Sequence, residues 1–327
     1  MNSDDPAATG DEIVYEWKDT IRAYHSGRVQ RLCPINFVPP SLDHTTGVQS
    51  KDVTINSSTG LSARVYLPPS IDGDNERKLP VLIYYHGGGF CIESAFSPHY
   101  HNYLNLLTAA ADIVAVSINY RLAPEHLLPA AYDDSWDAFQ WVASHSSSSD
   151  SGQDPWLSKF GNTEKIFLAG DSAGGNIVHH MGLRLGAAGM KVEGLVLIHP
   201  YFWGKEKFKT EEEEKEGAIV KAEDPEGIWR IVCSGKKELD DPWINPFAVG
   251  APSLVVLGCR RALVTTAGQD LMRERGRVYY EKLKESGWGG EVEFNEAEGE
   301  DHVFYLFDRN TEKAQELTQL LANFFNK

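Results

Sequence analysis

The stretch Ile166-Phe-Leu-Ala-Gly-Asp-Ser-Ala-Gly-Gly175 joins a short apolar run to a segment with helical character. The run Ile166–Ala169 does not alternate polar and apolar residues, which is typical of a strand buried on both faces of a parallel sheet. The following segment, Asn176–Leu185, has the spacing of a helix. Between them, Gly170–Gly174 has the form G-x-S-x-G, and its glycines permit a sharp turn. Such a turn raises the hydroxyl of Ser172 above the end of a sheet.

Similar runs and helical segments continue on both sides of this turn. Further short apolar runs occur at Val81–Tyr85, Ile113–Ile118, Leu195–Ile198, Ala262–Ala267 and Val292–Asn295. The helix-like segments are Tyr100–Ala111, Ala131–Ser144, Ala173–Gly186, Gly276–Ser286 and Thr311–Phe325. This alternation predicts the α/β class, with one domain over residues 1–327 and a mostly parallel central sheet flanked by helices.

The segments outside this alternation lead to separate predictions. Residues 51–56 and 61–67 alternate with period two, which predicts a hairpin at a sheet edge. Residues 1–20 are polar, and we expect partial disorder there. Residues 201–241 contain no strand-like run, which predicts an insertion folded over one end of the sheet. Within it, the acidic run Glu211–Glu214 predicts a solvated face.

The composition restricts the partners of this chain. The formal net charge is −16, and a field of that sign repels nucleic acid and anionic lipid surfaces, so we expect neither partner. No apolar run approaches the roughly 20 residues that a membrane span needs. We therefore expect a small-molecule ligand, while the oligomeric state is left open by the sequence.

The cysteines and the amino-terminal residues indicate the compartment. The four cysteines form no C-x-x-C pair and have no histidine at metal-ligand spacing, so we expect free thiols and no metal or cofactor. Residues 1–6 have neither a basic region nor an apolar region of the kind found in secretory signals. These features predict a cytoplasmic protein.

A triple-glycine loop follows the expected strand Val81–Tyr85 and reads His86-Gly-Gly-Gly-Phe90. A carbonyl attacked by a serine becomes an oxyanion, which needs preorganised N–H donors about 3 Å away. Successive glycines let backbone amides point into a site without obstruction by side chains. We therefore assign an oxyanion hole to the N–H groups of Gly88, Gly89 and Ala173. Phosphate binding is the alternative, but the loop lacks the Gly-Lys-Ser/Thr ending of a P-loop.

A serine nucleophile also needs a base and a carboxylate that orients the base. With a G-x-S-x-G turn, the chain order is Ser, then Asp or Glu, then His. His302 lies in a polar loop after the last expected strand, whereas His199 comes too early to follow an acid. Asp270 follows the strand Ala262–Ala267, at the end of the sheet where α/β proteins place their chemistry. The predicted triad is Ser172, Asp270 and His302; a helix N-cap is the alternative role of Asp270.

Several motifs in this sequence resemble the hormone-sensitive-lipase-like family of α/β-hydrolases. They are His86–Phe90, Asn119–Glu125 and Gly170–Gly175. Further motifs are similar to the plant carboxylesterase branch of this family: Asp241–Pro246, Asp270–Gly276, Tyr279–Trp288 and Gly299–Phe304. The resemblance implies the hydrolysis of carboxylic esters by the same triad and glycine loop. It also implies a cap over the acyl pocket, contributed by about residues 1–50 and 201–241.

The same branch includes relatives with other activities, which this sequence resembles less. Gibberellin receptors have lost the catalytic histidine, whereas His302 is present here. The 2-hydroxyisoflavanone dehydratases often change the nucleophile or the glycine loop, and Ser172 and the three glycines are intact here. We therefore predict a carboxylesterase that hydrolyses small neutral esters through an acyl-enzyme. The alternatives are a specialised eliminase, cyclase or acyltransferase, and a non-catalytic receptor. Residues 233–241 are shorter and more charged than is usual in the branch, which leaves the shape of the cap open.

Overall fold

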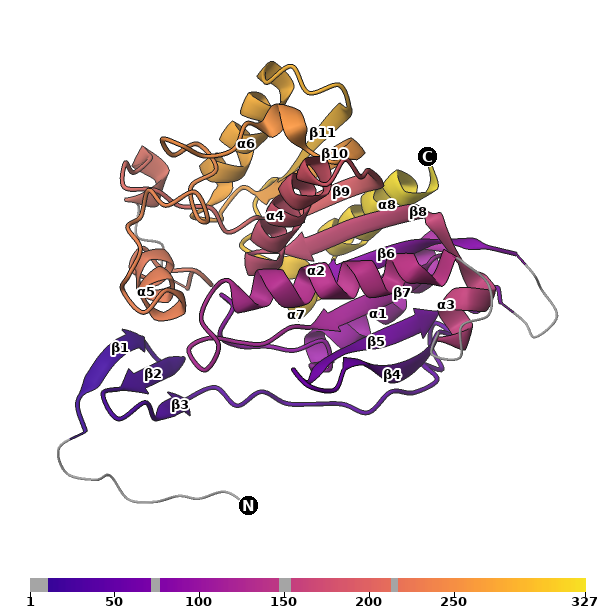
Figure 1. Cartoon of the computed structure of the whole chain (residues 1–327), viewed down its shortest axis with the longest axis horizontal. Coiled ribbons are helices and arrows are strands. Elements are labelled where there is room, and N and C mark those ends of the chain that lie inside the picture. Colours follow the sequence, from indigo (N-terminus) through magenta and orange to yellow (C-terminus); the bar gives the residue numbers. More distant parts are fainter. Residues whose placement is uncertain (1–10, 72–76, 147–153, 213–216) are drawn as a thin grey trace.

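The computed structural model describes residues 11–71, 77–146, 154–212 and 217–327. Its largest element is an eight-stranded sheet (Figure 1). In spatial order the strands are β11 (Glu291–Ala297), β10 (Cys259–Ala267), β9 (Val192–Ile198), β8 (Gly161–Asp171), β6 (Leu79–Tyr85), β7 (Val114–Asn119), β5 (Leu61–Leu67) and β4 (Gln49–Asn56). Neighbouring strands from β11 to β7 are parallel, while β5 and β4 are antiparallel to their neighbours. The predicted hairpin at a sheet edge is confirmed.

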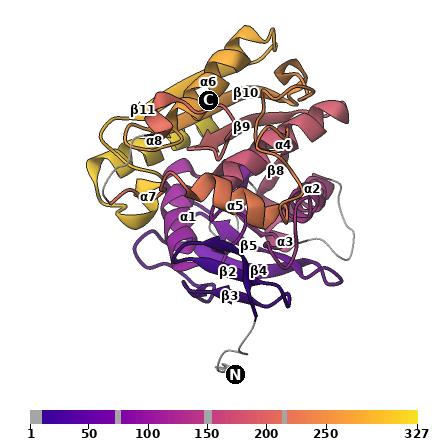
Figure 2. The ribbon, with the colours of Figure 1, turned by 90° about the vertical axis from the view of Figure 1, so that its left-hand side faces the viewer.

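Helices cover both faces of this sheet (Figures 1 and 2). One face packs against α1 (Pro98–Ala111) and α8 (Glu312–Asn326). The other face packs against α2 (Ala130–Ala143), α4 (Ala173–Ala187) and α6 (Arg273–Glu285). The predicted α/β-hydrolase fold, with a mostly parallel sheet flanked by helices, is confirmed.

Strand β6 illustrates why the central strands are apolar without alternation. Val81, Ile83 and Tyr85 belong to the core beneath α2 and α4. Leu82 and Tyr84 belong to the core beneath α1 and α8, on the opposite face. Because helices cover both faces of the sheet, the side chains that point to either face are buried, and consecutive positions along β6 are apolar. Burial of each large apolar side chain contributes about 1.5–3 kcal/mol to stability.

A second, three-stranded sheet lies near the amino terminus. It is made of β1 (Ile13–Trp17), β2 (Ile21–Tyr24) and β3 (Val29–Arg31), and β1 packs against α5 (Asp224–Val232). The expectation of disorder over residues 1–20 is therefore wrong for 13–17, and residues 1–10 lie outside the described residues. The exposed strand β1 carries only a weak alternation, and its partner α5 lies about 200 residues further along the chain. Local sequence therefore does not reveal this strand.

The acidic run at residues 211–214 differs from the prediction at its first position. Glu211 is buried, and its carboxylate accepts a hydrogen bond from Arg275 Nε over 2.6 Å. A solvated face is therefore wrong for Glu211, because Arg275 on α6 neutralises its charge. Glu212 is exposed, while Glu213 and Glu214 lie outside the described residues.

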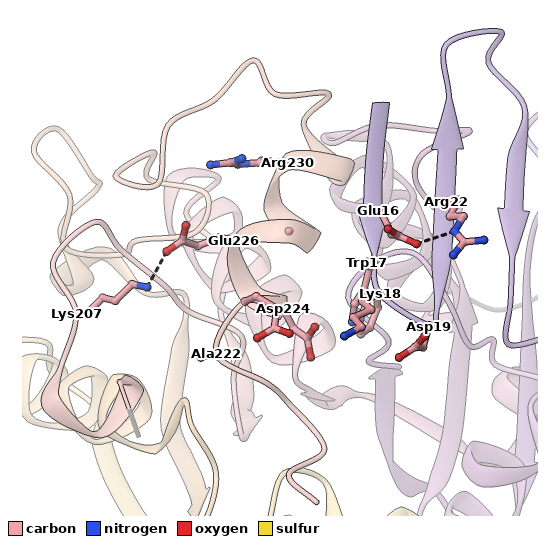
Figure 3. Close-up of a pocket in the computed structure, with 12 residues that line it drawn as sticks. Glu16, Trp17, Lys18, Asp19, Arg22, Lys207, Ala222, Asp224, Glu226 and Arg230 are labelled. Carbon is pink, nitrogen blue, oxygen red and sulfur yellow. Dashed lines mark hydrogen bonds and ion pairs between the residues drawn. The ribbon is translucent and has the colours of Figure 1, made fainter. Parts of the chain in front are cut away.

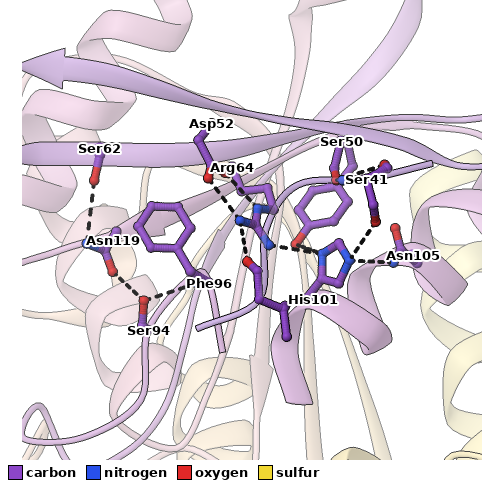
Figure 4. Close-up of polar contacts among 12 residues, drawn as sticks. Ser41, Ser50, Asp52, Ser62, Arg64, Ser94, Phe96, His101, Asn105 and Asn119 are labelled. Atoms are coloured by element: carbon purple, nitrogen blue, oxygen red, sulfur yellow. Dashed lines mark hydrogen bonds and ion pairs between the residues drawn. The ribbon is translucent and has the colours of Figure 1, made fainter. Parts of the chain in front are cut away.

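A buried polar cluster fastens the segment before β4 to the sheet (Figure 4). Arg64 on β5 is 1% exposed; it donates to Asp52 Oδ1 over 2.6 Å and to the Val38 carbonyl over 2.8 Å. Its guanidinium also lies 3.2 Å from His101 Nδ1 on α1. Burial and the Arg64 charge lower the pKa of His101 to about 4, so this ring is neutral at pH 7. The cluster joins three segments that lie far apart in the chain.

In the described part of the chain, no helix is both long enough and apolar enough to cross a lipid bilayer.

Candidate active site

The carboxyl ends of the parallel strands bring the predicted site residues to one edge of the sheet. Ser172 follows β8, Asp270 follows β10 and His302 follows β11. Gly88 and Gly89 follow β6. Residues at the carboxyl ends of neighbouring parallel strands share one edge of a sheet, which is where α/β proteins bind ligands. Ser172, His302 and both glycines line a common cavity.

The turn that carries Ser172 is tight and strained. Ser172 has φ 52° and ψ −117°, an unusual conformation for a residue with a side chain. Its N–H donates to the Ile198 carbonyl over 2.9 Å, and its carbonyl accepts from the Tyr201 N–H over 2.8 Å. A Cβ atom at Gly174 would lie 1.9 Å from the Tyr85 carbonyl oxygen, so only glycine fits there. These contacts hold the Ser172 side chain toward the cavity.

The side chains of Asp270 and His302 form a buried pair. His302 Nδ1 lies 2.7 Å from Asp270 Oδ2, and Asp270 Oδ1 accepts the Met272 N–H over 2.9 Å. Burial alone would raise the pKa of Asp270, but the adjacent His302 holds that pKa below its usual value. Burial alone would lower the pKa of His302, and the Asp270 charge outweighs this and raises it. Asp270 is therefore ionised, orients the imidazole and makes it a stronger base.

The ring of His302 and the hydroxyl of Ser172 lie along the same cavity without a direct hydrogen bond. No such bond joins them among the described residues. Catalytic hydrogen bonds are often long in ligand-free enzymes and tighten when the substrate binds. Because Asp270 occupies Nδ1, the Nε2 atom of His302 is the one available to the serine.

Three backbone N–H groups lie unpaired around this turn. In the described part of the chain, the N–H groups of Gly88, Gly89 and Ala173 donate to no protein acceptor. Gly88 has φ 91°, and a Cβ atom there would lie 2.3 Å from the Ile92 carbonyl oxygen. Ala173 is the first residue of α4, where N–H groups have no partner within the helix. All three groups are thus free to bind an oxyanion.

A buried carboxylate next to Ser172 supports the glycine loop, and sequence reasoning missed this role. The Gly87 N–H donates to Tyr100 Oη over 2.8 Å, and that hydroxyl donates to Asp171 Oδ2 over 2.8 Å. Tyr84 Oη donates to the other oxygen of Asp171, also over 2.8 Å. Burial raises the pKa of Asp171 to about 6 despite these two donors. The second position of G-x-S-x-G, directly before Ser172, is the only local signal for this residue.

We expect Tyr100→Phe to lower kcat for ester hydrolysis about tenfold, because one hydrogen bond to the glycine loop is lost. Tyr84→Phe is the matched control, since it removes an equally long bond to the same carboxylate without touching Gly87. Steady-state kinetics of both variants on one ester provide the measurement. Equal effects of the two substitutions on kcat would contradict a positioning role for Tyr100.

His199, which comes too early in the chain to be the predicted base, lies beside the Asp270–His302 pair. Its Nδ1 atom accepts the Val303 N–H over 2.9 Å, which fixes the backbone next to His302. Burial lowers the pKa of His199 to about 3, so it is neutral. His199, Asp270 and His302 have nitrogen and oxygen atoms within 4.8 Å of one another. A hydrogen-bonded base and carboxylate fit these residues better than a metal site, because Asp270 and His302 bond directly to each other.

The cavity at this edge has a volume of about 420 Å³ and a mostly apolar lining. Trp17 of β1 borders it on one side, with Pro225 and Ile228 of α5. Leu306 of α7 (Phe304–Phe307) also lines it. An apolar cavity next to a few converging polar groups is the usual form of a site for a small organic ligand.

A second cavity, of about 680 Å³, lies between β1 and α5 and also has Trp17 in its lining (Figure 3). Its lining is charged, and several of these charges are paired: Arg22 Nε lies 2.6 Å from Glu16, and Lys207 Nζ lies 3.1 Å from Glu226. It contains none of the predicted triad residues. The apolar cavity is therefore the better candidate for the reacting part of a substrate.

Comparison with known proteins identifies the family. A family model described as "alpha/beta hydrolase fold" matches residues 82–306, and one described as "Carboxylesterase family" matches residues 15–126. The chain is 42% identical to "Probable carboxylesterase 2" of Arabidopsis thaliana and 43% identical to "2-hydroxyisoflavanone dehydratase" of Glycyrrhiza echinata. These matches cover 98% of both chains in the first case and 99% of both in the second.

A solved esterase from Pyrobaculum calidifontis has the same architecture, with a TM-score of 0.71 and 31% identity. The match covers 85% of this chain and 84% of the esterase. This chain belongs to the α/β-hydrolase family. Within that family its sequence is similar to the plant carboxylesterases, as the motifs in the sequence predicted.

Proposed function

We propose that this hydrolase cleaves small neutral carboxylic esters through an acyl-enzyme on Ser172. The observation that carries the proposal is the buried Asp270–His302 pair, which shares one edge of the sheet with Ser172 on an apolar cavity. A base whose pKa is raised by a buried carboxylate can take the proton of a nearby hydroxyl. The relatives named carboxylesterase support the same activity.

The mechanism follows from these roles. Ser172 attacks the ester carbonyl while His302 takes the serine proton, and Asp270 stabilises the resulting imidazolium. The N–H groups of Gly88, Gly89 and Ala173 bind the oxyanion. His302 then protonates the leaving alcohol, and later it activates the water that releases the acid.

We further propose that the small sheet and residues 201–241 form a cap over the acyl pocket. Both parts supply apolar side chains to the cavity, with Trp17 from β1 and Ile228 from α5. A capped apolar cavity of about 420 Å³ favours a small neutral ester over a charged substrate. The net charge of −16 disfavours nucleic acid and anionic membranes as partners.

The activity should depend on pH through His302, because only its neutral form can act as a base. Since Asp270 raises the pKa of His302 above 6.5, kcat/KM for p-nitrophenyl acetate should rise with pH and reach a plateau above neutrality. Asp270→Asn removes the carboxylate charge, so the midpoint of this rise should move to lower pH. Rate profiles between pH 6 and 9 test both expectations. A midpoint that does not respond to Asp270→Asn would contradict the role of the pair.

Elimination is the second candidate reaction, because the dehydratase relative is 43% identical over nearly the whole chain. A proton-abstracting His302 and an oxyanion hole would also serve that chemistry. Product analysis separates the two reactions: hydrolysis gives an acid and an alcohol, and elimination gives an alkene.

We also propose a cytoplasmic location. The four cysteines are free thiols, and three of them are buried, which suits a reducing compartment. Fluorescence microscopy of a tagged full-length chain tests this location.

A further inference from the structure

The apolar cavity beside Ser172 has one charged wall. Glu93 and His99 both line it, and His99 Nδ1 lies 3.4 Å from Glu93 Oε1. The Glu93 side chain is 27% exposed and that of His99 is 45% exposed, so both can meet a ligand that enters the cavity. The mechanism proposed above uses neither residue. A carboxyl–imidazole pair outside the proposed triad, in a mostly apolar lining, therefore needs its own explanation.

The backbone at Glu93 adds a second observation. Glu93 has φ 68°, in the left-handed region that favours glycine. It follows the glycine loop directly, through the turn in which the Cys91 and Ile92 N–H groups donate to the Gly88 carbonyl. A non-glycine residue in this region is strained, and such strain concentrates at ligand-binding sites. The chain thus holds a carboxylate at this wall although its backbone conformation suits glycine better.

The pair joins a carboxyl group to an imidazole ring through a contact of 3.4 Å. Burial opposes ionisation of Glu93, but the hydrogen bond to His99 lowers the pKa of the carboxyl group overall. The same hydrogen bond raises the pKa of His99, so each partner favours the charged form of the other. It offers a strong acceptor beside a strong donor. A hydroxyl group can use both, whereas an ammonium or a carboxylate group would meet one like charge.

The position of the pair indicates which part of an ester it meets. The ring of His99 packs edge-on against Phe307, with 5.3 Å between ring centroids. Phe307 belongs to α7, which follows His302 almost directly. In the proposed mechanism His302 delivers a proton to the leaving oxygen, so the alcohol lies on the His302 side of Ser172. Glu93 and His99 therefore face the alcohol part of a bound ester.

We propose that Glu93 and His99 form a subsite for a hydroxyl group carried by the alcohol part of the substrate. The enzyme would then prefer esters of diols, sugars or hydroxylated phenols over esters of plain alcohols. This inference rests on the proposed esterase function, because it assigns the leaving alcohol to the His302 side.

Matched esters test this subsite. The pairs are propyl with 3-hydroxypropyl butanoate, and phenyl with 4-hydroxyphenyl butanoate. A hydrogen bond to a charged group is strong enough to change a rate constant about tenfold or more. We therefore expect kcat/KM about tenfold higher for the hydroxylated member of at least one pair. Equal values within both pairs would overturn the subsite, whereas failure to hydrolyse any of the four esters would contradict the esterase function itself.

Two substitutions link the preference to Glu93. Glu93→Gln keeps the size of the side chain and removes its charge, and Glu93→Gly removes the side chain from a position where glycine is unstrained. Both should lower the kcat/KM ratio of hydroxylated to plain ester toward one. Because Glu93→Gly relieves backbone strain, its Tm should not fall, so unfolding cannot explain a lost preference. Glu223→Gln, in the charged cavity between β1 and α5, is the control and should leave the ratio unchanged. A preference that survives both Glu93 substitutions would contradict the proposal.

Discussion

Replacing Ser172 with alanine should lower kcat for a p-nitrophenyl ester by on the order of 10⁶-fold. The hydroxyl is the nucleophile in the proposed mechanism, and no acyl-enzyme can form without it. The residual rate would come from the N–H groups that bind the oxyanion and from substrate binding, which the substitution leaves in place. Stopped-flow and steady-state kinetics of the purified variant provide the measurement.

Alanine fits the position of Ser172, so this variant should fold normally. The contacts that hold the turn are made by the backbone of residue 172, and its side chain accepts no cap hydrogen bond. The control is therefore the Tm, which should stay within a few degrees of the wild-type value. Turnover near the wild-type rate in a folded Ser172→Ala variant would rule out this nucleophile.

The second large effect is a steep loss of stability in mild acid. Five histidines are held neutral in the folded chain because burial lowers their pKa values. The pKa values of His86, His101 and His180 are lowered to about 4 and that of His199 to about 3. The pKa of His179 lies well below its usual value. In the unfolded chain all five titrate near pH 6.5.

The direction of this pH dependence of stability follows from whether the folded or the unfolded state binds more protons. Between about pH 6 and 4.5, the unfolded chain carries up to five more protons on these histidines, so stability falls as the pH falls. Asp171, whose pKa is raised to about 6, holds one extra proton in the folded state and offsets one of the five. The net difference of about four protons lowers the free energy of unfolding by about 5 kcal/mol per pH unit. This slope is large compared with the free energy of unfolding of a typical protein, which is about 5–15 kcal/mol.

Urea unfolding followed by circular dichroism at pH 7.5, 6.5 and 5.5 measures this slope. His180→Gln should reduce it by about 1.4 kcal/mol per pH unit, because it removes one titrating group. Glutamine can still donate to the Trp243 carbonyl, which His180 Nε2 contacts at 3.0 Å. A free energy of unfolding that changes by less than about 1 kcal/mol between pH 7.5 and 5.5 would contradict the account of these buried rings.

The central sheet could be predicted from the sequence because its signal is local. A strand buried on both faces is apolar at every position, as in Val81–Tyr85, and the pattern does not depend on distant residues. The strand β1 and the buried Glu211 could not be predicted in this way. Each depends on a partner more than 60 residues away, α5 for the strand and Arg275 for the carboxylate.

The residues of the candidate site likewise fall into those that the sequence reveals and those that it does not. Ser172 and the glycine loop lie in short motifs whose residue types are dictated by tight turns. The contacts of Asp171, Tyr100 and His199 depend on how strand ends and α1 pack together, and no spacing in the sequence reports that packing. Glu93 would look like an ordinary loop residue without its backbone conformation and its place in the cavity.

The location of a covalent adduct tests the central claim most directly. The protein would be treated with a fluorophosphonate, digested and analysed by mass spectrometry. We expect one phosphonyl group on the peptide that contains Ser172, formed together with the loss of esterase activity. Cys33 is a second nucleophile that lines the same cavity, and Cys33→Ala should leave the adduct in place. Loss of activity with the phosphonyl group on another residue, or full activity after Ser172 is modified, would contradict the account.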